Sequence, residues 1–64
     1  MAKKGKIVDT KALAHANLAV IAEQAGNFED AAKYWQEASD ASLNPNTRIL
    51  YGEAAKRCDR KSKA

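Results

Sequence analysis

The sequence predicts an all-α fold of three short helices. Fourteen of its 64 residues are alanine, the residue with the highest helix propensity, and most of them recur at helical spacing. Helix-breaking residues at 26–27 and at 43–46 divide the chain, and no segment alternates apolar and polar residues as a half-buried strand does. We therefore expect an antiparallel helical hairpin followed by a third helix, assembled as a homodimer.

The first helix is expected at about residues 10–25. Asp9 or Thr10 can cap it, because their side-chain oxygens can accept hydrogen bonds from the free amides of the first turn. Gly26 is expected to end it, because glycine readily adopts the left-handed conformation after a last helical turn. One apolar face combines Ala14, Leu18, Ile21, Ala22 and Ala25, and is widened by Leu13, Ala16 and Val20.

The second helix is expected at about residues 28–42, with Asn27 as its cap. Its apolar stripe lies opposite a charged side, so the face that packs inward is well defined. Trp35, the only tryptophan, is predicted to be the large core residue against which the alanines pack. The stripe consists of Phe28, Ala31, Ala32, Trp35, Ala38 and Ala41 or Ser42.

The third helix is expected to begin with Asn44 as cap and Pro45 as first helical residue, and to run to about Arg60. Leu50, Ala54 and Cys58 are spaced four apart and should share a face. This gives a three-helix domain at residues 10–60 between two basic tails, residues 1–9 and 61–64.

A chain of this length buries only about 60% of the surface that its unfolded form exposes, so small domains usually need an additional stabilising device. One cysteine cannot form a disulfide within the chain, and one cysteine with one histidine cannot complete a zinc site. We expect no metal and no cofactor, and we expect close helix packing together with self-association. The residues assigned to the core or to a dimer interface are Leu18, Ile21, Phe28, Trp35, Leu50 and Cys58.

The charges are distributed unevenly. Residues 1–11 carry a net charge of +3, residues 12–47 a net charge of −4, and residues 48–64 a net charge of +4. Basic ends of this kind either bind an acidic partner or serve as solvated tails, and both interpretations remain open. The candidate partner- or nucleic-acid-binding residues are Arg48, Lys56, Arg57, Arg60, Lys61 and Lys63.

The sequence offers little for catalysis. His15, the only histidine, has no nucleophile at a recognisable spacing, and no glycine-rich phosphate loop is present. Cys58 is either a packed thiol or a reactive one with a pKa lowered by Lys56, Arg57 and Arg60. We expect a protein that is not an enzyme. The chain has no apolar run of about 18 residues and no secretory signal pattern, so we expect it in the cytoplasm and not in a membrane.

Part of the chain resembles a single tetratricopeptide repeat, a helical hairpin that packs through small residues. The resemblance covers about residues 13–46 and rests on Leu18, the segment Gly26-Asn27-Phe28-Glu29-Asp30-Ala31-Ala32, Trp35, Ala38 and Pro45. Solenoids of this class need about three repeats, so one copy implies only the hairpin.

A second resemblance covers about residues 12–61. The chain is similar to the ANR family of small negative regulators of AraC-type activators, and to their PerC-like relatives, which occur in enteric bacteria and their phages. Family members tend to have a tryptophan at the position of Leu50 and an arginine at the position of Ala54. The matching residues are Ala22-Glu23-Gln24-Ala25-Gly26, Phe28, Ala31-Ala32, Trp35, Ala38, Asn46 and Arg48. The closing row is Leu50, Ala54 and Cys58, and its first two residues differ from those of the family.

The second resemblance implies a phage- or mobile-element-borne transcriptional regulator that acts as a helical dimer on another regulatory protein, with DNA contact through the basic ends left open. The competing hypothesis is a protein-interaction adaptor or inhibitor, built on a tetratricopeptide-like hairpin, that has no role in transcription. Sequence-specific DNA recognition is the weaker alternative, because the third helix has no set of Asn, Gln and Arg on one face for base edges.

Overall fold

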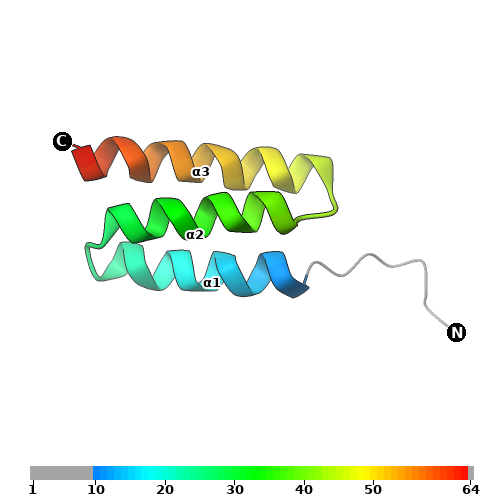
Figure 1. Cartoon of the computed structure of the whole chain (residues 1–64), viewed down its shortest axis with the longest axis horizontal. Helices are drawn as coiled ribbons and strands as arrows, with labels where there is room; N and C mark the ends of the chain where they lie inside the picture. Colours follow the sequence, from blue (N-terminus) through cyan, green and yellow to red (C-terminus); the bar gives the residue numbers. More distant parts are fainter. Residues whose placement is uncertain (1–9, 64) are drawn as a thin grey trace, which may run out of the picture.

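The computed structural model describes residues 10–63 and confirms the all-α fold. It consists of α1 (Thr10–Gln24), α2 (Phe28–Ala41) and α3 (Pro45–Lys63), and these described residues contain no strand. The helices alternate in direction, and α2 lies between α1 and α3 and packs against both (Figure 1). The predicted antiparallel hairpin is therefore present, with α3 added on the other side of α2. No helix in this part of the chain is long and apolar enough to cross a membrane.

The turn between α1 and α2 is set by Gly26. Its φ of 82° is in the left-handed region, as predicted. The amide of Gly26 donates to the carbonyl of Glu23 (3.0 Å) and the amide of Asn27 donates to the carbonyl of Ala22 (2.8 Å). This pair of hydrogen bonds is a Schellman motif, which satisfies two of the last carbonyls of α1 and reverses the chain.

The two predicted asparagine caps have different outcomes. Asn44 caps α3 as predicted, because its Oδ1 accepts hydrogen bonds from the amides of Asn46 (2.9 Å) and Thr47 (3.4 Å). Asn27 is the N-cap residue of α2, as predicted, but its side chain makes no cap hydrogen bond, and only its backbone carbonyl accepts, from the amide of Ala31 (2.9 Å). The Schellman turn fixes the backbone of Asn27 at φ −88° and ψ 69°, outside the extended conformation typical of a capping residue. The Asp9 alternative for capping α1 lies outside the described residues.

The helix ends agree with the predictions to within three residues. The largest difference is at α3, which continues to Lys63 instead of ending near Arg60. Lys61, Ser62 and Lys63 therefore form its last helical turn, where cations interact favourably with the helix dipole. The predicted tail at residues 1–9 lies outside the described part of the chain.

The core consists almost entirely of small residues. Burying an alanine methyl group stabilises by only about 0.8 kcal/mol, compared with about 1.5–3 kcal/mol for a leucine or isoleucine side chain. Small side chains do, however, let neighbouring helices approach closely. The buried apolar residues are Ala12, Ala16, Ala19, Ala22, Ala31, Ala38, Ala54, Ala55 and Cys58.

The predicted packing face of α1 is wrong in its rotational phase. Ala12, Ala16, Ala19 and Ala22 face α2, whereas Leu18 is 44% exposed and Ile21 is 61% exposed. Leu50 on α3 is likewise 64% exposed, although the other two members of its row, Ala54 and Cys58, are buried. Leu18, Ile21 and Leu50 thus lie outside the core of a single chain, and their assignment to a dimer interface stays a prediction. The physical reason is the distance between the helices, because leucine or isoleucine at the buried alanine positions would hold α1 and α3 farther from α2.

The aromatic side chains form the partly buried margin of this core. Phe28, Tyr34 and Trp35 pack against the cluster of Ala22, Ala31 and Cys58. The rings of Trp35 and Tyr51 lie 5.4 Å apart between centroids, at 37° to each other. Trp35 is half-buried and not enclosed, so it joins α2 to the edge of α3 instead of filling the centre.

Candidate interaction surfaces

The C-terminal half of α3 presents a basic surface, which we define as Lys56, Arg57, Arg60, Lys61 and Lys63. All five side chains are exposed. Lys56, Arg60 and Lys63 follow one another at i, i+4 and i+7, and Arg57 and Lys61 lie beside them at i and i+4. Arg48 does not belong to this group, because eight residues of helix place it about 12 Å before Lys56.

Two residues of the basic surface have partners. Lys63 Nζ lies 3.3 Å from Oδ2 of Asp59, one turn earlier on an exposed part of the helix. Lys61 Nζ lies 5.3 Å from the centre of the Phe28 ring, a cation–π contact that links the end of α3 to the start of α2. Among residues 10–63, Lys56, Arg57 and Arg60 form no ion pair. Their charge is therefore available to an acidic partner.

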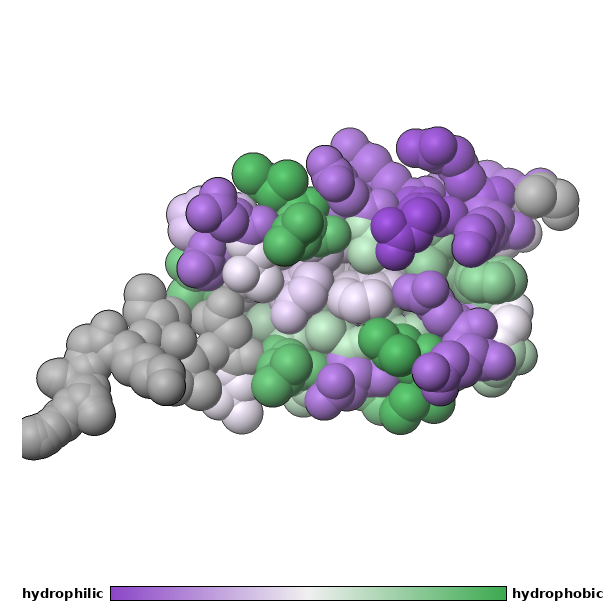
Figure 2. Space-filling view, turned by 180° about the vertical axis from the view of Figure 1, so that it is seen from behind, coloured by the Kyte–Doolittle hydropathy of each residue, from purple (hydrophilic) through white to green (hydrophobic). Residues whose placement is uncertain are grey.

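An apolar surface covers the outer side of α1. Leu13 is 56% exposed and Val20 is 41% exposed, in addition to Leu18 and Ile21. Figure 2 shows hydrophobic residues gathered over α1 and over the first half of α3 on one face, and hydrophilic residues over the second half of α3. The remaining exposed aliphatic residues are Leu43, Ile49 and Leu50, so all seven Leu, Ile and Val residues of the described chain lie on the surface.

Glu23 is a connecting residue that the sequence reasoning missed. The indole Nε1 of Trp35 donates a hydrogen bond of 2.5 Å to Glu23 Oε2, and the thiol of Cys58 also donates to this carboxylate. One α1 side chain thereby joins α2 and α3. A signal was present in the sequence, because Glu23 follows Ala12 by eleven residues and Ala19 by four, which places it beside the buried alanine row.

The environment of Cys58 resolves the two interpretations of its thiol. Its side chain is 1% exposed, so burial raises the pKa of the thiol, and the hydrogen bond and the charge of Glu23 raise it further. The charges of Arg57 and Lys61 act in the opposite direction and do not outweigh these effects. Cys58 is therefore a packed thiol and not an activated nucleophile.

His15 lies at the edge of the α1–α2 interface. Its Nδ1 is 3.0 Å from the carbonyl oxygen of Lys11, and its Nε2 is 3.3 Å from Oε1 of Glu37 on α2. Both ring nitrogens have partners in the chain, and no serine or cysteine nucleophile is among them. The residue links the two helices of the hairpin.

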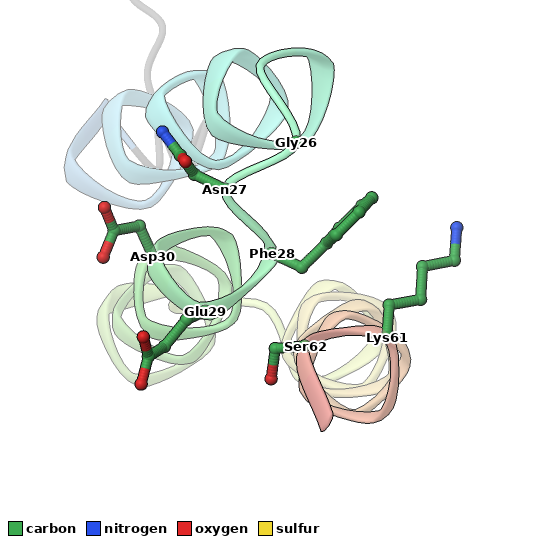
Figure 3. A pocket seen from close by; sticks show the side chains of 7 residues that line it. All are labelled: Gly26, Asn27, Phe28, Glu29, Asp30, Lys61 and Ser62. Carbon is green, nitrogen blue, oxygen red and sulfur yellow. The ribbon is translucent and has the colours of Figure 1, made fainter. Parts of the chain in front are cut away.

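A depression of about 340 Å³ lies at the end of the molecule where α2 begins and α3 ends. Figure 3 shows Phe28 and Lys61 pointing to the same side, whereas Glu29 and Asp30 point away from them. The two carboxylates already balance the positive end of the α2 dipole, and one lysine does not make the opening positive. Its lining residues are Gly26, Asn27, Phe28, Glu29, Asp30, Lys61 and Ser62.

Within residues 10–63, no group of three or more His, Cys, Asp or Glu side chains is placed to hold a metal ion.

Comparison of the chain with protein-family models, with curated proteins and with solved structures found no match.

Proposed function

We propose that the chain is a small, non-enzymatic regulator of transcription that works in the cytoplasm by binding another regulatory protein through the basic surface of α3. The observation that carries this proposal is the concentration of five exposed cations on one half of one helix, four of them without an ion pair among the described residues. Lysine and arginine at such a surface suit carboxylates of a protein as well as phosphates. The similarity to regulators that act on AraC-type activators supplies the class of partner.

A protein partner is favoured over direct reading of DNA bases. Base readout uses Asn or Gln for adenine together with Arg for guanine, and the basic surface contains neither Asn nor Gln. It also contains no aromatic residue on which a base could stack. Non-specific attraction to phosphates remains the contribution that this surface would make to DNA binding.

The proposal is tested by measuring binding of the fluorescently labelled chain to purified AraC-type activators by fluorescence anisotropy. A variant with all five residues of the basic surface changed to glutamine removes the charge and keeps a good helix-forming side chain. We expect it to bind at least about tenfold more weakly, since charge-assisted contacts contribute about 1.5–3 kcal/mol each when formed. The matched control is Arg48→Gln, on the same helix but outside the surface, which should bind within about twofold of the original chain.

Each outcome of this test is informative. Binding that ignores the five substitutions contradicts the role of the basic surface, and binding to none of the activators contradicts the proposed class of partner. Binding to duplex DNA alone would replace the proposal with a nucleic-acid function. In that case the logarithm of the binding constant should fall against the logarithm of salt concentration with a slope of about −4.5 for five phosphate contacts.

A second candidate function is that of an adaptor or inhibitor with no role in transcription. The observations that favour it are the tetratricopeptide-like hairpin and the exposed Leu43, Ile49 and Leu50 at the α2–α3 connection and the start of α3. An apolar contact of this kind hardly responds to salt, whereas the basic surface should lose affinity as salt rises. A Leu50→Lys variant separates the two, because it should weaken binding only for the adaptor.

A further inference from the structure

The outer side of α1 is mostly apolar, with Asn17 and Gln24 as its exposed amides. Within α1 only Lys11 and Glu23 carry a full charge, and Glu23 faces α2 and α3. The side chains between these two residues are apolar apart from His15 and Asn17. The alanine row faces α2, and the opposite row, Ala14, Leu18, Ile21 and Ala25, is exposed. A helix that is apolar on both sides is typical of one that is covered on both sides.

We infer that a second copy of this chain covers the outer side of α1, with the two α1 helices antiparallel about a two-fold axis. The exposed row reads small, large, large, small along the helix, and it reads the same in the reverse direction. A two-fold axis between positions 19 and 20 places Leu18 against the partner's Ile21 and Ala14 against the partner's Ala25. Such a symmetric contact requires a surface that is complementary to itself, and this order of side-chain sizes provides one.

Charge favours the antiparallel direction. A parallel pair would bring together the two Lys11 side chains and the positive ends of both helix dipoles. An antiparallel pair places the two Lys11 side chains at opposite ends of the contact and sets the two helix dipoles in opposite directions, which is favourable. The centre of the contact contains no acidic or basic side chain that could repel its copy.

The size of the contact sets the expected affinity. The 15 residues of α1 extend about 22 Å, and a helix surface is ~10 Å wide, so the strip is smaller than the roughly 800 Å² per partner of a standard interface. The strip is nevertheless rich in aliphatic residues, and their burial favours association. We expect a dissociation constant in the roughly micromolar range.

The test is sedimentation equilibrium of the purified chain over roughly 1–300 µM, without DNA or any other protein. The chain should change from monomer to dimer across this range. Ile21→Lys should weaken the dimer at least about 100-fold, because the substitution is present in both copies and removes two isoleucine side chains from the contact. Ile49→Lys is the matched control, because Ile49 is 60% exposed and Ile21 is 61% exposed, and it should leave the dimer unchanged.

A mixing experiment tests the direction of the pair. Leu18→Glu and Ile21→Lys should each be monomeric alone, but their mixture should form a heterodimer in which the introduced carboxylate and ammonium groups face each other. Circular dichroism confirms that each variant is still helical, as expected for substitutions at exposed positions. A chain that stays monomeric at the highest concentration overturns the inference, as does a dimer that survives Ile21→Lys or is lost on Ile49→Lys. Failure of the two monomeric variants to combine overturns the antiparallel arrangement.

Discussion

Removing the Glu23 carboxylate should destabilise the fold through contacts with two other helices. In Glu23→Ala, the indole Nε1 of Trp35 and the thiol of Cys58 both lose their acceptor. A hydrogen bond to a charged group contributes about 1.5–3 kcal/mol, but Glu23 and Trp35 are only half-buried and water can replace part of this contact. We therefore expect a loss of about 1–2 kcal/mol, which corresponds to a fall in Tm of roughly 5–15 °C for a domain of this size.

Urea denaturation followed by circular dichroism is the appropriate assay, because tryptophan fluorescence would respond directly to the change beside Trp35. Glu23→Gln keeps an acceptor oxygen without the charge and should lose about half as much stability. The matched control is Glu53→Ala, an exposed carboxylate on α3, which should change the stability by less than about 0.5 kcal/mol. Equal effects of Glu23→Ala and Glu53→Ala would refute the linking role of Glu23. A second readout is the pKa of the Cys58 thiol, which Glu23 raises and which should therefore fall in Glu23→Ala.

Two further predictions concern the glycines and the thiol. Gly26→Ala should destabilise by about 1 kcal/mol because φ is +82°, whereas Gly52→Ala should stabilise by about 0.5–1 kcal/mol, since its new methyl would meet only Ser39 Oγ at 3.7 Å. Thermal unfolding of the two variants checks this, and effects of the same sign would contradict it. Folding raises the pKa of the Cys58 thiol above its value in the unfolded chain. The stabilisation by the protonated thiol should therefore be fully present below about pH 8.5 and lost as pH rises through the folded-state pKa. We therefore expect the difference in unfolding free energy between the original chain and Cys58→Ala to become smaller from neutral pH to about pH 10. A difference that stays constant over this range would contradict the raised pKa of the buried thiol.

The local signals in the sequence predicted the helices well. Gly26 and the Asn44-Pro45 pair act within a few residues, so their effect on helix ends does not depend on what packs against them. The inward face of α2 was also predicted, because its apolar stripe lies opposite charged residues and only one orientation buries the stripe. Propensity and periodicity are sufficient where a helix has one apolar side and one polar side.

The face of α1 could not be predicted in the same way. Both of its sides are apolar, and periodicity ranks the row of Leu18 and Ile21 above the row of alanines because its side chains are larger. The chain buries the alanines because close approach of the helices requires small side chains, which is a property of the neighbouring helix and not of α1 alone. Glu23 was missed for a related reason, since its partners Trp35 and Cys58 lie on two helices distant in sequence. The basic surface needed no tertiary information, because five positive charges within eight helical residues are exposed in any packing that leaves one side of α3 uncovered.

The arrangement of the three helices has a consequence for how the two proposed contacts combine. Because α2 separates α1 from α3, a second copy on the outer side of α1 would leave the basic surface of α3 uncovered. The directions of the helices also place the end of α3 at the same end of the molecule as the end of α1, so an antiparallel α1 pair would carry one basic surface near each end of the dimer. Two such surfaces on one particle increase the effective concentration of the second contact once the first has formed, provided that the partner presents two acidic sites at a matching distance. Dimer formation would then raise the apparent affinity for a paired partner without adding a contact at either basic surface, and the Ile21→Lys monomer should retain the affinity of one site while losing this gain.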